Sequence, residues 1–356
     1  MTLSDSRAAR LSRLKPFVLR RPALLARRRR IERMRLGVQL ASLLVVVWIG
    51  FRFAAWVQSL EAGQIAPRPA GVEGFLPISS LMSLRHWMAS GELSRVHPAG
   101  LVILLLVIGT GLLLKKAFCS WICPVGFVSE SLASLGRRVF RRKLRLPRAL
   151  DIPLRGLKYL LLAFFVYAVF FRMTPGDIAG FLESPYNKMA DVKMMYFFAH
   201  ITSFALKVLG ALVVLSVVIP YFWCRYLCPY GALLGFISLA SPLKITRIAP
   251  NCIDCGLCAK ACPANLAVDR ADRVRSDECH ACLSCIAACP VPIALQVETP
   301  PFWRRAVRPA VFAALVLTLF YGGIQVAKLS GYWQTNITPA EYSQRIREID
   351  SPQYHH

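Results

Sequence analysis

Long apolar stretches alternate with shorter polar segments along most of the chain. A helix needs roughly 20 apolar residues to cross the hydrocarbon core of a bilayer. Five stretches approach or exceed that length, at residues 36–57, 98–114, 156–173, 196–223 and 309–327. The second and third are short or have a lysine beside them, so their ends are poorly defined. The pattern predicts a mainly α-helical membrane protein with about five transmembrane helices.

Basic residues divide the connecting segments into two kinds. The segment before the first predicted span is rich in arginine, with an unbroken run at 27–30, and the loop 115–155 is basic again. The loops 58–97 and 174–195 are nearly neutral. Because cytoplasmic loops carry the excess of Lys and Arg, the amino terminus is predicted to be cytoplasmic. Five spans then place the carboxyl terminus in the periplasm of a bacterial inner membrane.

Composition supports a membrane protein and favours lipid and metal over nucleic acid as its binding partners. Of the 356 residues, 56% are hydrophobic, and the formal net charge is +25. The basic residues cluster beside apolar segments, which favours lipid head groups over nucleic acid as their partner. Residues 1–35 are therefore predicted to form a solvated, mostly disordered basic tail. Twelve cysteines in a long chain favour metal ligation over a small extracellular disulfide scaffold.

The strongest chemical signal is a pair of cysteine runs between the fourth and fifth predicted spans. In each run the four cysteines are separated by two, two and three residues and are followed by proline, as in bacterial ferredoxins. The fourth cysteine of each run is directed to the other cluster. We therefore predict two [4Fe–4S] clusters, one on Cys252, Cys255, Cys258 and Cys289, and the other on Cys279, Cys282, Cys285 and Cys262.

Structural zinc is the alternative for these eight cysteines. Zinc needs four ligands at each site and has no use for this spacing closed by proline. The spacing thus favours iron–sulfur clusters. These clusters also suit the reducing cytoplasm, where the charge pattern puts this stretch.

A repeated motif, Cys-x-x-x-Cys-Pro, ends the second and fourth predicted spans. Cysteines four apart lie on one face of a helix, and the prolines suit the first turn of a new helix. Same-direction repeats imply a pseudo-two-fold axis along the membrane normal, with short interfacial helices at 125–135 and 231–240. These cysteines are a candidate third metal centre or a redox-active dithiol pair, and buried small residues are the alternative. They are Cys119, Cys123, Cys224 and Cys228.

Together these motifs resemble the NapH/NosR/CcoG group of membrane polyferredoxins, and most closely its YccM-type members. The resemblance covers most of the chain from about residue 36. It implies electron transfer between the membrane quinone pool and a redox partner, or redox service to metalloenzyme maturation. The chain lacks the large periplasmic flavin-binding domain of NosR types and the folded domain expected after the last span in CcoG types. These departures argue against denitrification and copper-reduction roles.

The expected organisation has five parts. They are a basic cytoplasmic tail (1–35), a membrane domain with four spans and both Cys-x-x-x-Cys-Pro motifs (36–245), a cytoplasmic ferredoxin-like α+β domain for two clusters (246–300), a fifth span (301–328) and a short periplasmic tail (329–356).

The expected function is an electron relay between the quinone pool and a redox partner protein, in contact with membrane lipid and without nucleic acid. A copper reductase or assembly factor for a respiratory metalloenzyme is the alternative, and an integral subunit of a larger complex is a third hypothesis. The sequence has no phosphate-binding glycine loop, flavin-attachment sequence or nucleophile–base pair, which argues against a hydrolase or a self-contained dehydrogenase.

Overall fold

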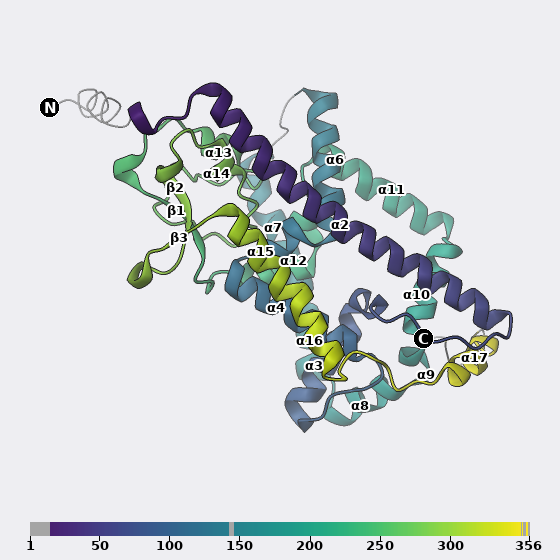
Figure 1. Cartoon of the computed structure of the whole chain (residues 1–356). Coiled ribbons are helices and arrows are strands. Elements are labelled where there is room, and N and C mark those ends of the chain that lie inside the picture. The colour runs from purple at the N-terminus through teal and green to yellow at the C-terminus, as the bar shows by residue number, and fades with distance from the viewer. Residues whose placement is uncertain (1–14, 142–145, 350, 352–353, 355–356) are drawn as a thin grey trace. The chain divides into compact units, whose positions relative to one another are not determined.

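The computed structural model describes residues 15–141, 146–349, 351 and 354, and it is built mainly of helices (Figure 1). The chain divides into two compact units. Unit 1 comprises Met1–Ser42, Ile108–Lys143 and Tyr230–Leu319, and unit 2 comprises Leu43–Val107, Leu144–Pro229 and Phe320–His356. The first fourteen residues of the predicted basic tail lie outside the described residues.

Within the described residues, three helices are long and apolar enough to cross a membrane. Large apolar side chains stand exposed along them, including Leu44, Phe51 and Phe164. Such faces are unfavourable in water and suit lipid, so the chain is a membrane protein. The three helices are α2 (Arg21–Glu61), α7 (Arg148–Tyr167) with a π-helical continuation to Arg172, and α15 (Pro309–Leu317), which continues through a π-helical turn into α16 (Gly323–Leu329).

The other two predicted spans differ from simple crossing helices. Helix α4 (Pro98–Leu114) is apolar but has only 17 residues. Helices α10 (Ala190–Ala199) and α11 (Ser203–Val218) qualify as a span only as a pair, and they are bent by 82° at the break between them. Thr202 starts the second helix by accepting a hydrogen bond from the Ala205 amide. Two helices therefore replace the single straight span predicted over 196–223.

Shorter helices complete the two units, and several of them begin with proline. Proline suits the first helical turn because its φ is fixed and its missing N–H has no partner there. Helices α6 and α12 begin at the two prolines that follow the cysteine motifs, as the sequence predicted. The shorter helices outside the ferredoxin runs are α3 (Pro77–Ser90), α5 (Ala117–Trp121), α6 (Pro124–Phe140), α8 (Pro175–Glu183), α9 (Pro185–Lys188), α12 (Pro229–Ile237) and α17 (Pro339–Arg347).

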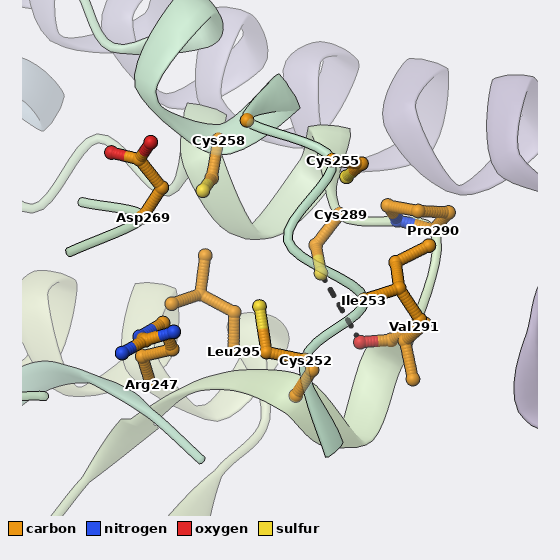
Figure 2. A pocket seen from close by; sticks show the side chains of 12 residues that line it. Arg247, Cys252, Ile253, Cys255, Cys258, Asp269, Cys289, Pro290, Val291 and Leu295 are labelled. Atoms are coloured by element: carbon orange, nitrogen blue, oxygen red, sulfur yellow. Dashed lines mark hydrogen bonds between the residues drawn. The ribbon is translucent and has the colours of Figure 1, made fainter. Parts of the chain in front are cut away.

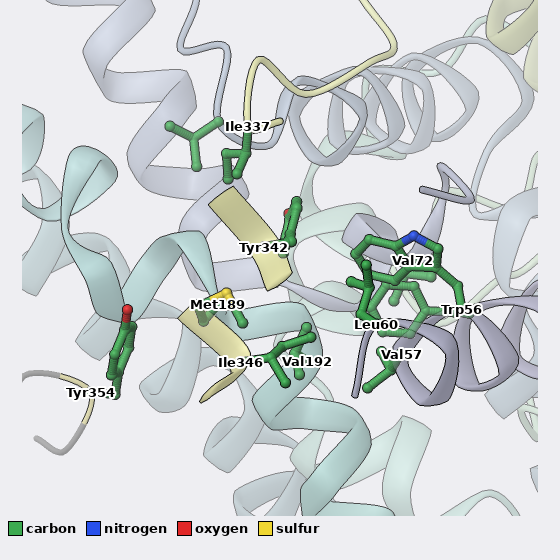
Figure 3. Packing of buried hydrophobic residues seen from close by; sticks show 12 residues of the cluster. Trp56, Val57, Leu60, Val72, Met189, Val192, Ile337, Tyr342, Ile346 and Tyr354 are labelled. Carbon is green, nitrogen blue, oxygen red and sulfur yellow. The ribbon is translucent and has the colours of Figure 1, made fainter. Parts of the chain in front are cut away.

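The core of unit 2 joins the end of α2 to the C-terminal segment. Trp56 and Leu60 of α2 are buried in one cluster with Val192 and Tyr342 (Figure 3). The Trp56 ring lies edge-on to the Tyr342 ring, with centroids 5.1 Å apart. Tyr354, near the end of the chain, is buried in the same cluster. The segment that the sequence predicts to be a short tail is therefore folded into this unit.

A buried ion cluster lies in unit 2. Arg68 Nε donates to Asp191 Oδ2 at 3.0 Å, and Arg68 Nη1 donates to Glu73. Both carboxylates are fully buried, and the Arg68 side chain is 5% exposed. The Tyr342 hydroxyl donates to Asp191 at 3.4 Å. The cluster therefore ties the loop before α3 to α10 and α17.

A small α+β region lies in unit 1 between α12 and α15. Strands β1 (Lys244–Arg247), β2 (Leu295–Glu298) and β3 (Ala306–Val307) are antiparallel and pair in the order β1-β2-β3. Helices α13 (Leu257–Ala261) and α14 (Ser284–Ala288) pack against each other. Pairing of β1 with β2 brings together the two ends of the stretch that carries the ferredoxin-type cysteines.

Candidate iron–sulfur site

The ferredoxin-type cysteines line two cavities in unit 1. The first cavity encloses about 370 Å³, counting space that opens to solvent, and is lined by Cys252, Cys255, Cys258 and Cys289 (Figure 2). The first three come from one run, and Cys289 is the fourth cysteine of the other run. These are the four residues assigned to one cluster from their spacing. Their ligation of iron remains a prediction.

The second cavity has the reciprocal composition. It encloses about 340 Å³ on the same measure and is lined by Cys262, Cys279, Cys282 and Cys285. Cys262 comes from the first run and the other three from the second. The fold therefore groups the eight cysteines into two crossed sets of four. We refer to the sites as cavity 1 and cavity 2.

A zinc ion and a cubane make different demands on four cysteines. Zinc ligands converge on one point, with each sulfur about 2.3 Å from the metal. Across the described residues, no three His, Cys, Asp or Glu side chains converge closely enough to hold one metal ion. A cubane instead takes one thiolate on each of its four irons. Cysteines arranged around a cavity fit that requirement.

The two cysteine loops have matching backbone conformations. Asp254 and Gly256 flank Cys255 with φ angles of 52° and 68°, and Ala281 and Leu283 have φ angles of 47° and 61° on either side of Cys282. A left-handed conformation costs a non-glycine residue roughly 1–2 kcal/mol. Residues of this kind persist where the surroundings fix them and are concentrated at functional sites. Their equivalent positions mark the two loops as a repeated functional unit.

The cysteines of cavity 2 are more buried than those of cavity 1. All four cysteines of cavity 2 are buried, whereas Cys255 in cavity 1 is exposed. Burial raises the pKa of Cys258 and of Cys262 to about 11. Burial is also the largest single influence on Cys282 and raises its pKa, but His280, Arg35 and the Ser284 hydroxyl together outweigh it, and the pKa falls to about 6. Iron binds thiolates, so cluster binding must displace protons from the high-pKa thiols.

The membrane cysteines lie at helix ends. Cys119 is in α5, but Cys123 has extended backbone and caps the start of α6. Cys224 lies in a π-helical turn, Trp223–Leu227, and Cys228 after it is again extended. The prediction that each pair shares one helix face is wrong, because proline disfavours helical backbone at the residue before it. Cys119 and Cys123 belong to unit 1 and the other pair to unit 2, so a centre shared by all four remains a prediction.

Residues inside the first membrane motif hold the loop of cavity 2. Trp121 Nε1 donates to the backbone carbonyl of Ala281 at 3.1 Å, and the Ser120 hydroxyl donates to the carbonyl of His280. Gln39 of α2 donates in turn to the Ser120 carbonyl at 3.0 Å. The Trp121 side chain is fully buried. The first motif is thus hydrogen-bonded to the backbone between two predicted cluster ligands.

The second membrane motif is fixed by a buried carboxylate. Asp151, in the first turn of α7, accepts hydrogen bonds from Arg225 Nε at 2.9 Å and Nη2 at 2.8 Å. It also accepts one from the Tyr226 hydroxyl at 2.6 Å. Tyr226 stands two residues after its motif's first cysteine, as Trp121 does in the other copy. Sequence reasoning overlooked both residues, although a buried aromatic residue with a polar atom usually has a hydrogen-bond partner.

Two iron–sulfur families match parts of the chain. The family described as "4Fe-4S binding domain" matches residues 96–147 and 203–247, which include both membrane motifs. The family described as "4Fe-4S dicluster domain" matches residues 244–290, which include both ferredoxin-type runs. No solved structure matches the chain.

Similarity to known proteins decides the family. The chain is 43% identical over 319 residues to the putative electron transport protein YccM of Escherichia coli K12, covering 88% of this chain and 89% of YccM. The chain belongs to the NapH/NosR/YccM-like family. Membership confirms the predicted family, and the chain is a membrane protein with 4Fe-4S domains in a family that includes a putative electron transport protein.

More distant relatives match a smaller part of this chain. The ferredoxin-type protein NapH of Escherichia coli K12 is 28% identical over 60% of this chain and 71% of NapH. Protein NirI of Paracoccus denitrificans is 29% identical over 60% of this chain, but the match covers only 31% of NirI. The chain therefore shares most of the length of YccM and NapH, and corresponds to one part of NirI.

Proposed function

We propose that this YccM-like protein relays single electrons between the quinone pool of the bacterial inner membrane and a redox partner protein. Two [4Fe–4S] clusters serve the relay, one in each cavity, on the cysteines that line it. The supporting observation is the crossed grouping, in which each cavity takes one cysteine from the other run. Crossed ligands keep two clusters adjacent, as a relay requires.

The chain itself determines ligation, solvent access and orientation. A bound [4Fe–4S] cluster supplies one-electron chemistry. The exposed Cys255 leaves cavity 1 accessible to a soluble partner. Cavity 2, whose four cysteines are buried, is the membrane-side site, because Ser120 and Trp121 connect its loop to the Cys119–Cys123 motif. The arginine-rich start of α2 supports a cytoplasmic position for the amino terminus and the clusters, with the carboxyl terminus in the periplasm.

The four membrane cysteines are proposed to extend the relay as a further metal or redox centre. Their repeat and their fixed backbone support this role, since the segments around them are held by Trp121 in one copy and by Asp151 in the other. The family that matches both motifs is itself described as 4Fe-4S binding.

Quinone-linked oxidation of the clusters tests the function. The full chain, in membranes, is reduced with dithionite under anaerobic conditions, freed of excess reductant, and mixed with a short-chain quinone. Two reduced clusters and two protons convert one quinone to quinol, so the EPR signals of the reduced clusters should disappear as quinol forms. Clusters that are present but keep their electrons would overturn the quinone link. Copper bound to the membrane cysteines, without quinone-dependent oxidation, would favour the metal-reductase alternative.

A further inference from the structure

The amino-terminal part of α2 lies on the loop that carries Cys289. The Leu19 amide donates to the carbonyl of Pro290 at 2.8 Å, and Arg27 Nη1 donates to the carbonyl of Cys289 at 3.1 Å. All of these residues belong to unit 1. The segment predicted to be a solvated tail is therefore helical from Arg21 onward and contacts the one cysteine of cavity 1 that comes from the second run.

The charge of Arg27 distinguishes it from its neighbours. Its side chain is partly buried, and no carboxylate pairs with it within the described part of the chain. Arg28, the next residue, is 54% exposed and pairs with Glu32 at 2.8 Å. Arg247 also lines cavity 1 and interacts with Cys252, but its charge is paired with Asp254 and Asp272. Arg27 thus brings an unneutralised positive charge, partly shielded from water, to the backbone of Cys289.

A positive charge with a hydrogen-bond donor at a cluster ligand favours the reduced cluster, which carries one more negative charge. Net charge, hydrogen bonding and solvent exposure are the features that set cluster potentials. We propose that Arg27 is a positioning residue for the cluster in cavity 1: it holds Cys289 in place and raises the reduction potential of that cluster. The inference rests on the cluster ligation in the proposed function.

Helix α2 therefore has two roles. The same helix crosses the membrane and, through its first two turns, sets the properties of the partner-side cluster. Two hydrogen bonds support the loop at Cys289: the Leu19 amide donates to the carbonyl of Pro290, and the Arg27 guanidinium donates to the carbonyl of Cys289. A ligand that must reach across from the other run gains most from such support.

The test uses the full chain with Arg27→Gln, Arg27→Lys and the matched control Arg28→Gln. Each protein is titrated by EPR under anaerobic conditions, and Cys255→Ser identifies the signal of the cavity 1 cluster. We expect Arg27→Gln to make reduction of that cluster about tenfold less favourable, which corresponds to about 59 mV for one electron. The other cluster and the Arg28→Gln protein should keep wild-type potentials. Arg27→Lys should shift less, because it retains the charge.

The outcomes separate the inference from the function on which it rests. A wild-type chain without iron and sulfide would remove the proposed function. If both variants hold two clusters, and the cavity 1 cluster has the same potential in Arg27→Gln as in Arg28→Gln, the role of Arg27 is overturned and the proposed function still stands. Selective loss of the cavity 1 cluster from Arg27→Gln, with the other cluster retained, would support the positioning role. The effect on the reduction potential of the cavity 1 cluster would then be measured in Arg27→Lys.

Discussion

The indole N–H of Trp121 donates a hydrogen bond to the carbonyl of Ala281, 160 positions further along the chain. Ala281 lies between two predicted ligands of the cluster in cavity 2, and Trp121 lies between the two cysteines of the first membrane motif. One side chain thus links a membrane-motif segment to a cluster loop. Its ring also packs near Phe312 of α15, with centroids 5.9 Å apart. The indole is therefore fixed by packing as well as by its hydrogen bond.

Trp121→Phe should weaken the cluster in cavity 2 specifically. The substitution keeps an aromatic ring but removes the donor to Ala281, and a net hydrogen bond is worth roughly 1 kcal/mol. We expect iron to leave cavity 2 about fivefold faster in the presence of a chelator. Loss of visible cluster absorbance, with EPR to distinguish the two clusters, measures the effect. Equal loss from both cavities would indicate a general effect of the mutation on folding.

Asp151→Asn should release the second membrane motif. The change leaves the Arg225 guanidinium buried without its carboxylate, which is strongly unfavourable. The π-helical turn should then open, and Cys224 should react faster with a maleimide, as measured by mass spectrometry of the modified peptide. Glu92→Gln, at an exposed residue of the same unit, is the matched control. Unchanged reactivity in Asp151→Asn would show that the turn is held by other contacts.

Arg68→Met should destabilise unit 2. It leaves the buried carboxylates of Glu73 and Asp191 without their cation, and breaking a buried ion pair in this way costs roughly 3–5 kcal/mol. A clearly lower thermal unfolding midpoint in detergent is the expected result. Arg347→Gln, at an exposed position on α17, should leave the midpoint almost unchanged. Similar midpoints for the two variants would mean that the ion cluster adds little stability.

Single substitutions of the fourth cysteines test the crossed ligation. Cys262→Ala should damage the cluster of the second run, and Cys289→Ala should damage the cluster of the first. EPR spectra of both variants, compared with Cys255→Ser and Cys285→Ser as references for each cavity, identify the cluster that is lost. If each variant instead lost the cluster of its own run, the crossed arrangement would be wrong.

Local sequence patterns predicted the parts of the site that depend on spacing. The grouping of Cys289 with the first run follows from the ferredoxin-type pattern, and the starts of α6 and α12 follow from Pro124 and Pro229. The same prolines also carried information that was overlooked. They explain why Cys123 and Cys228 leave the helical conformation, so a pairing along one helix face was not to be expected.

Long-range contacts were beyond the reach of sequence reasoning. The contact of Arg27 with Cys289 spans 262 positions, and composition alone suggested a disordered tail. Arginine, alanine and leucine are nevertheless good helix formers, and the Arg28–Glu32 pair is spaced as in a helix. Hydropathy likewise passes over the bend between α10 and α11, although Thr202 is a recognisable helix cap.

Iron and sulfide analysis of the anaerobically purified full chain, combined with EPR, is the most direct test of the two-cluster proposal. Two cubanes predict about eight irons and eight acid-labile sulfides per chain, with two EPR signals after reduction. Additional iron would point to a further centre at the membrane cysteines. A protein that carries zinc and no acid-labile sulfide would contradict the proposal.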